Sequence, residues 1–320
     1  MIKKKVLIFG ASGQIGRYCI RRLVKDNYKV TAVTRNKHQK AYVLKTQAPI
    51  GYLDIEEADI FNEEKITKFI SETDICINLV GILFEKGKRD TFENIHNKFP
   101  KLISRICSQE KKKFLHLSAL GLEDAKDSLY ALSKLNGEES IKKNLSSATI
   151  LKPSIVYSVD DKFTTKFMSI LSLLPIFPLY YNGSTKFCPV HASDVSEVIF
   201  KVISNEIYSK SIEVIGPEII TFKEILEKLL FAINKKRILL PLPLFLAKAS
   251  ASIFQLLPTP LITNDQLKLL KYDNIKSSNG ITNFDIGAPS KILFDNGIQE
   301  YAYNWREGGK FSLEKNNKVK

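Results

Sequence analysis

The chain has 320 residues, 44% of them hydrophobic, and a formal net charge of +14 at pH 7. This length and hydrophobic content predict a soluble globular protein, most simply one large domain with a smaller lobe. Only eight of the 48 basic residues are Arg, and no basic block is interleaved with aromatic residues, which argues against nucleic acid as a partner.

The first predicted strand and turn lie in residues 6–16, which read VLIFGASGQIG. An apolar run ends at Gly10, Gly13 and Gly16 follow at intervals of three, and apolar residues then resume at helical spacing. A strand, a tight turn and a helix start in this order let backbone N–H groups approach a pyrophosphate at the positive end of the helix. The pattern therefore predicts a dinucleotide-binding turn, with an ordinary glycine-rich turn as the alternative.

Strands and helices alternate through the first half of the chain. Strands are expected at residues 6–9, 29–34, 54–59, 75–80, 114–117 and 148–151, the last one ending at Pro153. Helices are expected at residues 17–26, 62–72, 95–108 and 128–142. This alternation predicts an α/β fold of the NAD(P)-binding Rossmann type, a doubly wound parallel sheet with helices on both faces.

The regular alternation fails from Asp161 onward, where prolines punctuate the chain. Helices are expected at residues 194–203 and 221–233, both in a smaller lobe, and a strand near 211–216 is expected to return to the sheet. The expected division is a Rossmann domain over 1–155 with that return strand, a smaller C-terminal substrate or partner lobe over 156–310, and a disordered tail over 311–320.

The cysteines, the start of the chain and its longest apolar region indicate where the protein is located. The four cysteines are far apart and show no metal-ligand spacing, so reduced thiols and no metal site are expected: Cys19, Cys76, Cys107 and Cys188. The first strand begins within about five residues of Met1, which leaves no room for a signal or transit peptide and predicts a cytoplasmic protein. The longest apolar region, residues 238–257, contains two prolines, a Lys and a Gln, which argues against a transmembrane helix.

The residues after the second strand indicate which dinucleotide is bound. An acidic residue at this position would hold a ribose 2′-OH, but the sequence has Thr34 and Arg35. An Arg can hold a 2′-phosphate by a charge-assisted pair, so NADP(H) is favoured over NAD(H), with a solvated strand-end charge as the alternative. Asp59, after the third strand, is placed to meet the adenine or to cap the following helix.

A second group of polar residues has the pattern of a proton-transfer site. Ser118 ends the fifth strand, and Tyr130 and Lys134 lie one turn apart on one face of the next predicted helix. In such a site Lys134 holds the nicotinamide ribose and lowers the pKa of Tyr130, Tyr130 transfers a proton, and Ser118 orients the substrate. A Tyr and a Lys at this spacing are common by chance, and only their place in a dinucleotide fold gives them weight.

Several segments in order resemble the extended short-chain dehydrogenase/reductase superfamily. They are VLIFGASGQIGRY, INLVGILFE, FLHLSALG, SLYALSKLNGEESI, ATILKPSIVYSVDDKF and CPVHASDVSEVI, and the similarity covers about residues 4 to 260. More narrowly the chain resembles atypical members related to the nucleotide-binding accessory subunit of respiratory complex I, whose C-terminal lobe is similar to LPLPLF at residues 240–245.

The resemblance implies a tightly held NADP(H) and a set of residues that bind it. They are Gly10, Ser12, Gly13, Gln14, Ile15, Gly16, Arg35, Asp59, Leu79, Tyr130 and Lys134, to which we add Pro153 at the end of the sixth strand. Cys188 stands where the family commonly has Gln, and Ser158 where it usually has Gly. Both departures lie toward the smaller lobe, so they bear on substrate chemistry more than on nucleotide binding.

Three functions fit these observations. The first is an NADP(H)-binding accessory or assembly subunit of complex I, with a mainly structural nucleotide, complex I subunits as partners and a peripheral contact with the cytoplasmic face of the inner membrane. The second is a freestanding NAD(P)-dependent reductase, dehydrogenase or epimerase that uses Tyr130 and Lys134. The third is a non-catalytic sensor of the ratio of reduced to oxidised NADP.

The remaining polar residues have simpler interpretations. The histidines His96, His116 and His191 have no metal-ligand spacing and are expected to be core or surface residues. Asp160 and Asp161 are expected to serve a turn or a helix cap. Residues 238–257 are expected to be buried in the smaller lobe, with docking on a partner or a membrane surface as the alternative.

Overall fold

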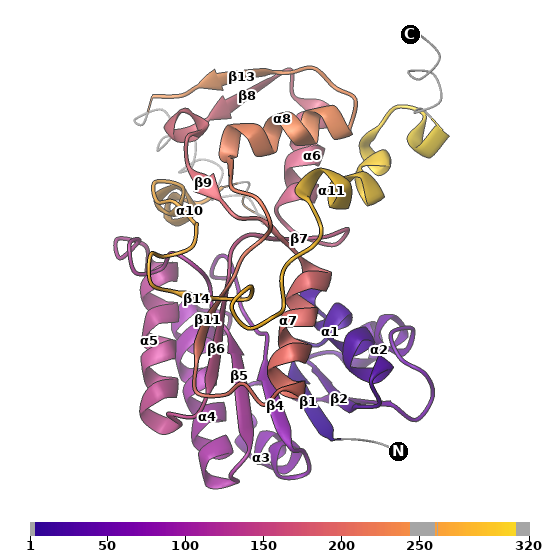
Figure 1. Ribbon diagram of the computed structural model, residues 1–320, viewed down its shortest axis with the longest axis vertical. Coiled ribbons are helices and arrows are strands. Elements are labelled where there is room, and N and C mark those ends of the chain that lie inside the picture. The colour runs from indigo at the N-terminus through magenta and orange to yellow at the C-terminus, as the bar shows by residue number, and fades with distance from the viewer. Residues whose placement is uncertain (1–3, 244–259, 261, 312–320) are drawn as a thin grey trace. The chain divides into compact units, whose positions relative to one another are not determined.

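The computed structural model describes residues 4–243, 260 and 262–311 (Figure 1). The chain divides into two compact units, each made of three segments. The first unit consists of Met1–Pro153, Ala192–Val214 and Lys276–Pro289. The second consists of Ser154–His191, Ile215–Ile275 and Ser290–Lys320.

The first unit contains an eight-stranded parallel sheet in the order β14-β11-β6-β5-β4-β1-β2-β3. Its strands are β1 (Lys5–Phe9), β2 (Lys29–Thr34), β3 (Leu53–Glu57), β4 (Ile75–Asn78), β5 (Lys113–Leu117), β6 (Thr149–Pro153), β11 (Ser211–Val214) and β14 (Ile281–Thr282). The central strands are almost wholly buried, as expected of a parallel sheet covered on both faces. The expected doubly wound α/β fold is confirmed.

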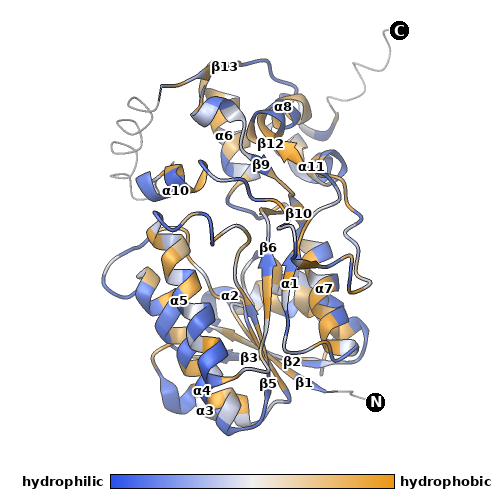
Figure 2. Cartoon of the chain, turned by 60° about the vertical axis from the view of Figure 1, so that its left-hand side comes forward, coloured by the Kyte–Doolittle hydropathy of each residue, from blue (hydrophilic) through white to orange (hydrophobic). Residues whose placement is uncertain are grey.

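Helices cover both faces of this sheet (Figure 1). They are α1 (Gln14–Lys25), α2 (Lys37–Lys45), α3 (Glu63–Ser71), the π-helical turn η1 (Glu93–Lys98), α4 (Phe99–Gln109), α5 (Leu129–Asn144) and α7 (Ala192–Ser204). On one face α1 packs against α7, and on the other α4 packs against both α3 and α5. Figure 2 shows hydrophobic residues along the strands and hydrophilic residues on the outer surfaces of α4 and α5.

Helix starts follow from capping side chains. The Asn62 side chain accepts a hydrogen bond from the Lys65 amide at 3.0 Å, and that of Ser128 accepts one from the Ala131 amide at 3.3 Å. Both residues are the predicted first residues of their helices, and each satisfies a donor that the first helical turn leaves unpaired. The prediction of these two starts is confirmed.

The helix expected at residues 95–108 is instead η1 followed by α4. Pro100 has no N–H to donate to the carbonyl of His96, so regular α-helical bonding cannot continue through this turn. The His96 carbonyl faces α5 at Gly137, where an added Cβ would lie only 1.9 Å from the carbonyl oxygen. The irregular turn and the close approach of α5 thus occur at one place.

Two assignments of elements to the smaller lobe were wrong. Helix α7, expected there as residues 194–203, packs against α1 in the first unit. Residues 276–289, which include β14, also belong to the first unit. The physical reason is that parallel β6 and β11 need a crossover helix between them, and α7 supplies it. Helix α2 was missed because Leu44 is its only buried residue.

The second unit is built from short strands and helices around its own apolar cluster. Its elements are β7 (Val156–Tyr157), α6 (Thr164–Leu173), β8 (Ile176–Leu179), η2 (Tyr180–Gly183), β9 (Lys186–Phe187), β10 (Val190–His191), β12 (Ile220–Thr221), α8 (Phe222–Ala232), β13 (Ile238–Pro241), α10 (Asn264–Leu269), α11 (Phe294–Ala302) and η3 (Tyr303–Trp305). Residues of α6, α8 and α11 form the core of this cluster.

Asp161 lies in the turn that leads into α6, and a turn is one of the two roles expected for it. Its carboxylate accepts hydrogen bonds from the amides of Phe163 at 2.7 Å and Thr165 at 3.2 Å. The two departures from the family pattern, Ser158 and Cys188, are both buried in this unit. Their side chains therefore face the protein interior.

Some expectations fall partly outside the described residues. Of the apolar region 238–257, the structure describes β13 and the two residues after it, and the rest lies outside the described part, as does the expected tail apart from Phe311. All four cysteines are buried and free. Among the described residues, no helix is long and apolar enough to cross a membrane.

Candidate functional site

The glycine turn joins the carboxyl end of β1 to the start of α1. Gly10 has φ +78°, and an added Cβ would lie 3.0 Å from the backbone carbon of Leu79. Gly16 lies against the turn, where an added Cβ would be 2.4 Å from the Ala11 carbonyl oxygen. A side chain at Gly10 would be strained, and one at Gly16 would push α1 away from the strand. The spacing of these two glycines thus reflects backbone requirements.

The start of α1 has the character of an anion site. Gly13 is its N-cap residue, with no side-chain cap, and the first turn contains no acidic residue. The positive end of a 12-residue helix therefore faces the turn, and no carboxylate in the first helical turn offsets it. Gly13 is exposed, and Ser12, Gln14 and Ile15 are half-buried beside it. This arrangement fits the pyrophosphate of a dinucleotide.

The ends of the neighbouring strands bring two more predicted residues to this edge of the sheet. Leu79 follows β4, and its amide donates to the Phe9 carbonyl at 3.0 Å beside the turn. Pro153 ends β6, and its carbonyl accepts from the Leu120 amide at 2.9 Å. Both residues lie at carboxyl ends of parallel strands, where ligands of this fold class bind.

Tyr130 and Lys134 lie one turn apart on α5. The Lys134 ammonium is 5.7 Å from the centre of the Tyr130 ring and 3.5 Å from the Leu117 carbonyl. Burial lowers the pKa of Lys134 to about 8, although Glu138 opposes the shift, and burial raises the pKa of Tyr130. An added Cβ at Gly81, three residues after β4, would lie 3.7 Å from the Lys134 nitrogen, so the segment after β4 lies next to Lys134.

Ser118 directly follows β5, but its hydroxyl already donates a hydrogen bond. It donates to Glu138 Oε1 at 2.5 Å, and the other carboxylate oxygen of Glu138 is 3.1 Å from the Lys152 ammonium. Lys152 also pairs with Glu123 at 2.5 Å. Burial alone would lower the pKa of Lys152, but the two carboxylates outweigh it and raise the pKa. A hydroxyl has one proton, so Ser118 cannot donate to this carboxylate and to a substrate together.

His96 is packed between α5 and the segment after β4 that contains Gly81 and Ile82. Its Nε2 accepts from the Ile82 amide at 3.1 Å, its Nδ1 is 2.9 Å from the Ser133 hydroxyl, and its ring meets that of Tyr130 edge to face. Burial, with the positive charge of Lys134, lowers the pKa of His96 to about 2. His96 is therefore a neutral core histidine, one of the two roles expected for it.

Glu138, Lys152 and the contacts of His96 were missed by the sequence analysis. Glu138 follows Lys134 by four residues, so helical spacing places it on the face of Tyr130 and Lys134, and that signal could have identified it. No comparable signal connects Lys152, which lies on another strand.

Arg35 and Asp59 lie at the carboxyl ends of β2 and β3 in ion pairs with one loop. Arg35 Nη1 is 2.9 Å from Asp90 Oδ1, and Asp59 pairs with Arg89. The Phe61 amide also donates to Asp59 at 3.0 Å. Partial burial opposes the change, but this amide and Arg89 lower the pKa of Asp59. Arg35 has an exposed strand-end guanidinium, whereas Asp59 forms a turn and an ion pair.

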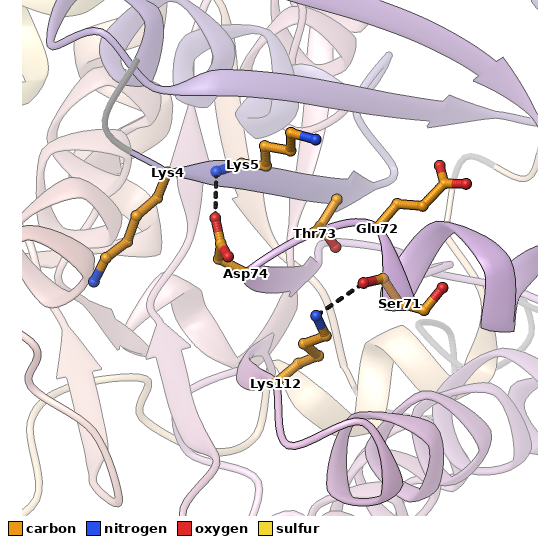
Figure 3. A pocket seen from close by; sticks show the side chains of 7 residues that line it. All are labelled: Lys4, Lys5, Ser71, Glu72, Thr73, Asp74 and Lys112. Atoms are coloured by element: carbon orange, nitrogen blue, oxygen red, sulfur yellow. Dashed lines mark hydrogen bonds between the residues drawn. The ribbon is translucent and has the colours of Figure 1, made fainter. Parts of the chain in front are cut away.

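A separate cavity of about 300 Å³ lies at the other edge of the sheet (Figure 3). It is lined by Lys4, Lys5, Ser71, Glu72, Thr73, Asp74 and Lys112. The Lys5 amide donates to Asp74 at 2.8 Å and the Lys112 ammonium to the Ser71 carbonyl at 2.9 Å. The cavity adjoins the amino end of β1, so it is distinct from the glycine turn.

Within the described part of the chain, no group of three or more potential metal ligands gathers.

Comparisons with known proteins agree with this geometry. NADH dehydrogenase (ubiquinone) 1 alpha subcomplex subunit 9, mitochondrial, of Arabidopsis thaliana is 25% identical over 315 residues, 94% of this chain and 78% of the relative. The NADH-ubiquinone oxidoreductase 40 kDa subunit, mitochondrial, of Neurospora crassa is 25% identical over 311 residues, 96% of this chain and 80% of the relative.

Among solved structures, a UDP-N-acetylglucosamine 4-epimerase from Bacillus cereus has a TM-score of 0.66 at 15% identity, covering 95% of this chain and all of that one, a likeness of fold alone. The model of the NAD dependent epimerase/dehydratase family matches residues 6–216. These residues include the glycine turn, Ser118, Tyr130 and Lys134, and the resemblance inferred from the sequence is confirmed. The chain belongs to the NAD dependent epimerase/dehydratase family.

Proposed function

We propose that this protein is a dinucleotide-binding accessory or assembly subunit of respiratory complex I, and that it holds NADP(H) mainly as a structural element. The names of the two relatives support the association with complex I. Dinucleotide binding is supported by the glycine turn and by the first turn of α1, which has no side-chain cap and no acidic residue. The preference for NADP(H) is supported by Arg35, at the position where a 2′-phosphate is recognised in this fold class.

The observation that carries the structural role is the hydrogen bond from Ser118 to Glu138. It occupies the hydroxyl proton with a buried carboxylate, and burial raises rather than lowers the pKa of Tyr130. A proton donor or acceptor works best with a pKa near the working pH, so both features disfavour proton transfer. A bound NADP(H) would supply a hydride donor or acceptor. In the proposed structural role, Lys134 and the glycine turn only bind this nucleotide.

Purification of the protein from native membranes tests this proposal. We expect mass spectrometry to find complex I subunits with it, and heat denaturation at neutral to mildly alkaline pH to release NADP(H). We also expect deletion of the gene to lower assembled complex I. Normal assembly in the deletion strain would contradict the accessory role, whereas a purified chain without nucleotide would contradict the binding role. Cell fractionation tests its location, because a subunit follows complex I and a free cytoplasmic protein does not.

Replacing Lys134 with Met is expected to weaken NADP(H) binding by about tenfold or more, because its ammonium is cationic below a pKa of about 8 and is buried beside Gly81. Lys143, exposed in a pair with Glu139 on the same helix, provides the matched control. Calorimetric titration should show normal binding by Lys143→Met. Equal NADP(H) affinities of the two variants would show that Lys134 does not contribute to the binding site.

The alternative is a freestanding reductase, dehydrogenase or epimerase, supported by the placement of Tyr130 and Lys134 on one face of α5. For this alternative, Tyr130→Phe abolishes turnover and leaves nucleotide bound. For the accessory role, Tyr130→Phe leaves complex I assembly unchanged. Measuring both in the same strain separates the two functions.

A further inference from the structure

The segment after β4 forms a hairpin over residues 85–92, which we call the strap. The Lys86 amide donates to the Asp90 carbonyl at 2.9 Å, and the tip contains Gly87 at φ +64°. At its base the Phe92 amide donates to Glu85 at 2.7 Å. Neither hydrogen bond involves the carboxylate of Asp90, so these two contacts within the strap do not depend on its charge.

The strap connects three strand ends of the first unit. It starts from β4, Arg89 pairs with Asp59 after β3, and Asp90 pairs with Arg35 after β2. Arg35 Nη1 donates to both carboxylate oxygens of Asp90, at 2.9 and 3.0 Å. Because β1 lies between β4 and β2 in the sheet, the strap must cross the end of β1, which leads into the glycine turn.

We propose that Asp90 weakens the preference for NADP(H) over NAD(H), because its carboxylate competes with the 2′-phosphate of NADP(H) for the Arg35 guanidinium. This inference rests on the proposed dinucleotide site. A phosphate on the same guanidinium lies within roughly 6 Å of the carboxylate, and two anions at that distance repel each other. NAD(H) has no 2′-phosphate, so it binds without this repulsion.

The strength of the competing pair suits such a role. The side chains of Arg35 and Asp90 are 67% and 32% exposed, and exposed ion pairs are weak. Arg and phosphate form one of the stronger charge-assisted pairs. NADP(H) therefore binds Arg35 against the repulsion of Asp90 at a cost in affinity, and the chain discriminates less between the two nucleotides than Arg35 alone would allow.

Titration of the full-length chain with NADP⁺ and NAD⁺ tests the proposal. Asp90→Asn keeps the size of the side chain and removes its charge, and we expect NADP⁺ to bind about threefold to tenfold more tightly while NAD⁺ affinity is unchanged. Arg35→Gln should remove the preference for NADP⁺. Asp54→Asn is the matched control, because Asp54 forms an exposed pair with Lys29 at 2.9 Å at the other ends of β2 and β3.

Thermal unfolding of each variant checks that the fold is retained. Unchanged or weaker NADP⁺ binding by a folded Asp90→Asn would overturn the competition, while the proposed function would stand if the unmodified chain binds NADP⁺. If the unmodified chain binds neither nucleotide, the proposed function and this inference both fail. An equal gain in Asp54→Asn would also overturn the role of Asp90, because it would show a general effect of net charge.

Discussion

Replacing Lys152 with Met is expected to lower the free energy of unfolding by about 3–5 kcal/mol. Lys152 and Glu138 are 8% and 3% exposed, and their charged atoms are 3.1 Å apart. Without the ammonium, the carboxylate of Glu138 stays buried and keeps only the hydrogen bond from Ser118 and the electrostatic interaction with Lys134. A buried charge that loses its partner costs far more than the pair itself contributes. Urea unfolding measures the loss.

Two further variants identify the cause of this loss. Lys143→Met removes the exposed partner of Glu139 on α5 and should cost no more than about 0.5 kcal/mol. The double variant Lys152→Met with Glu138→Leu removes both charges and should recover most of the stability. A loss of under about 1 kcal/mol in Lys152→Met would show that Glu138 is not an uncompensated buried charge.

Lowering the pH from 6.5 toward 4 is expected to destabilise the protein through two neutral, buried histidines. Burial, with the charge of Lys134, lowers the pKa of His96 to about 2 and that of His116 to about 3, both from 6.5. Between these values and 6.5 the unfolded chain binds the protons and the folded chain does not, so stability falls as the pH falls. The slope is about 1.4 kcal/mol per pH unit for each histidine and about 2.7 for both.

Unfolding curves at several pH values check this slope. Carboxylates also contribute to acid unfolding, so the test is the difference between variants. His116→Gln should reduce the slope below pH 6.5 by about 1.4 kcal/mol per pH unit, even if it lowers stability at pH 7. His38→Gln, at an exposed position on α2, should leave the slope unchanged. Parallel slopes for both variants would mean that His116 is charged in the folded state.

Much of the first unit could be predicted from local rules. The glycine turn, the bounds of β2 and the caps Asn62 and Ser128 depend on backbone conformation and hydrogen bonds within a few residues. Tyr130 and Lys134 share a face because four residues make about one helical turn. Such features can be predicted without reference to distant parts of the chain, and the structure has them at the predicted residues.

The partners of the predicted site residues could not be found in this way. Glu138 is 20 residues from Ser118, and Asp90 is 55 residues from Arg35. Each carries an ordinary charge whose effect depends on what folds against it. The same holds for α7, whose amphipathic pattern predicts a helix but cannot say which sheet it covers.

Residue order and short-range geometry are thus sufficient to predict the glycine turn, the helix that presents Tyr130 and Lys134, and the family. The folded chain was needed to show that Ser118 donates its proton to Glu138 and that the Arg35 guanidinium pairs with Asp90. Hydrogen bonds and ion pairs act over a few ångströms, and only folding brings residues so distant along the chain within that range.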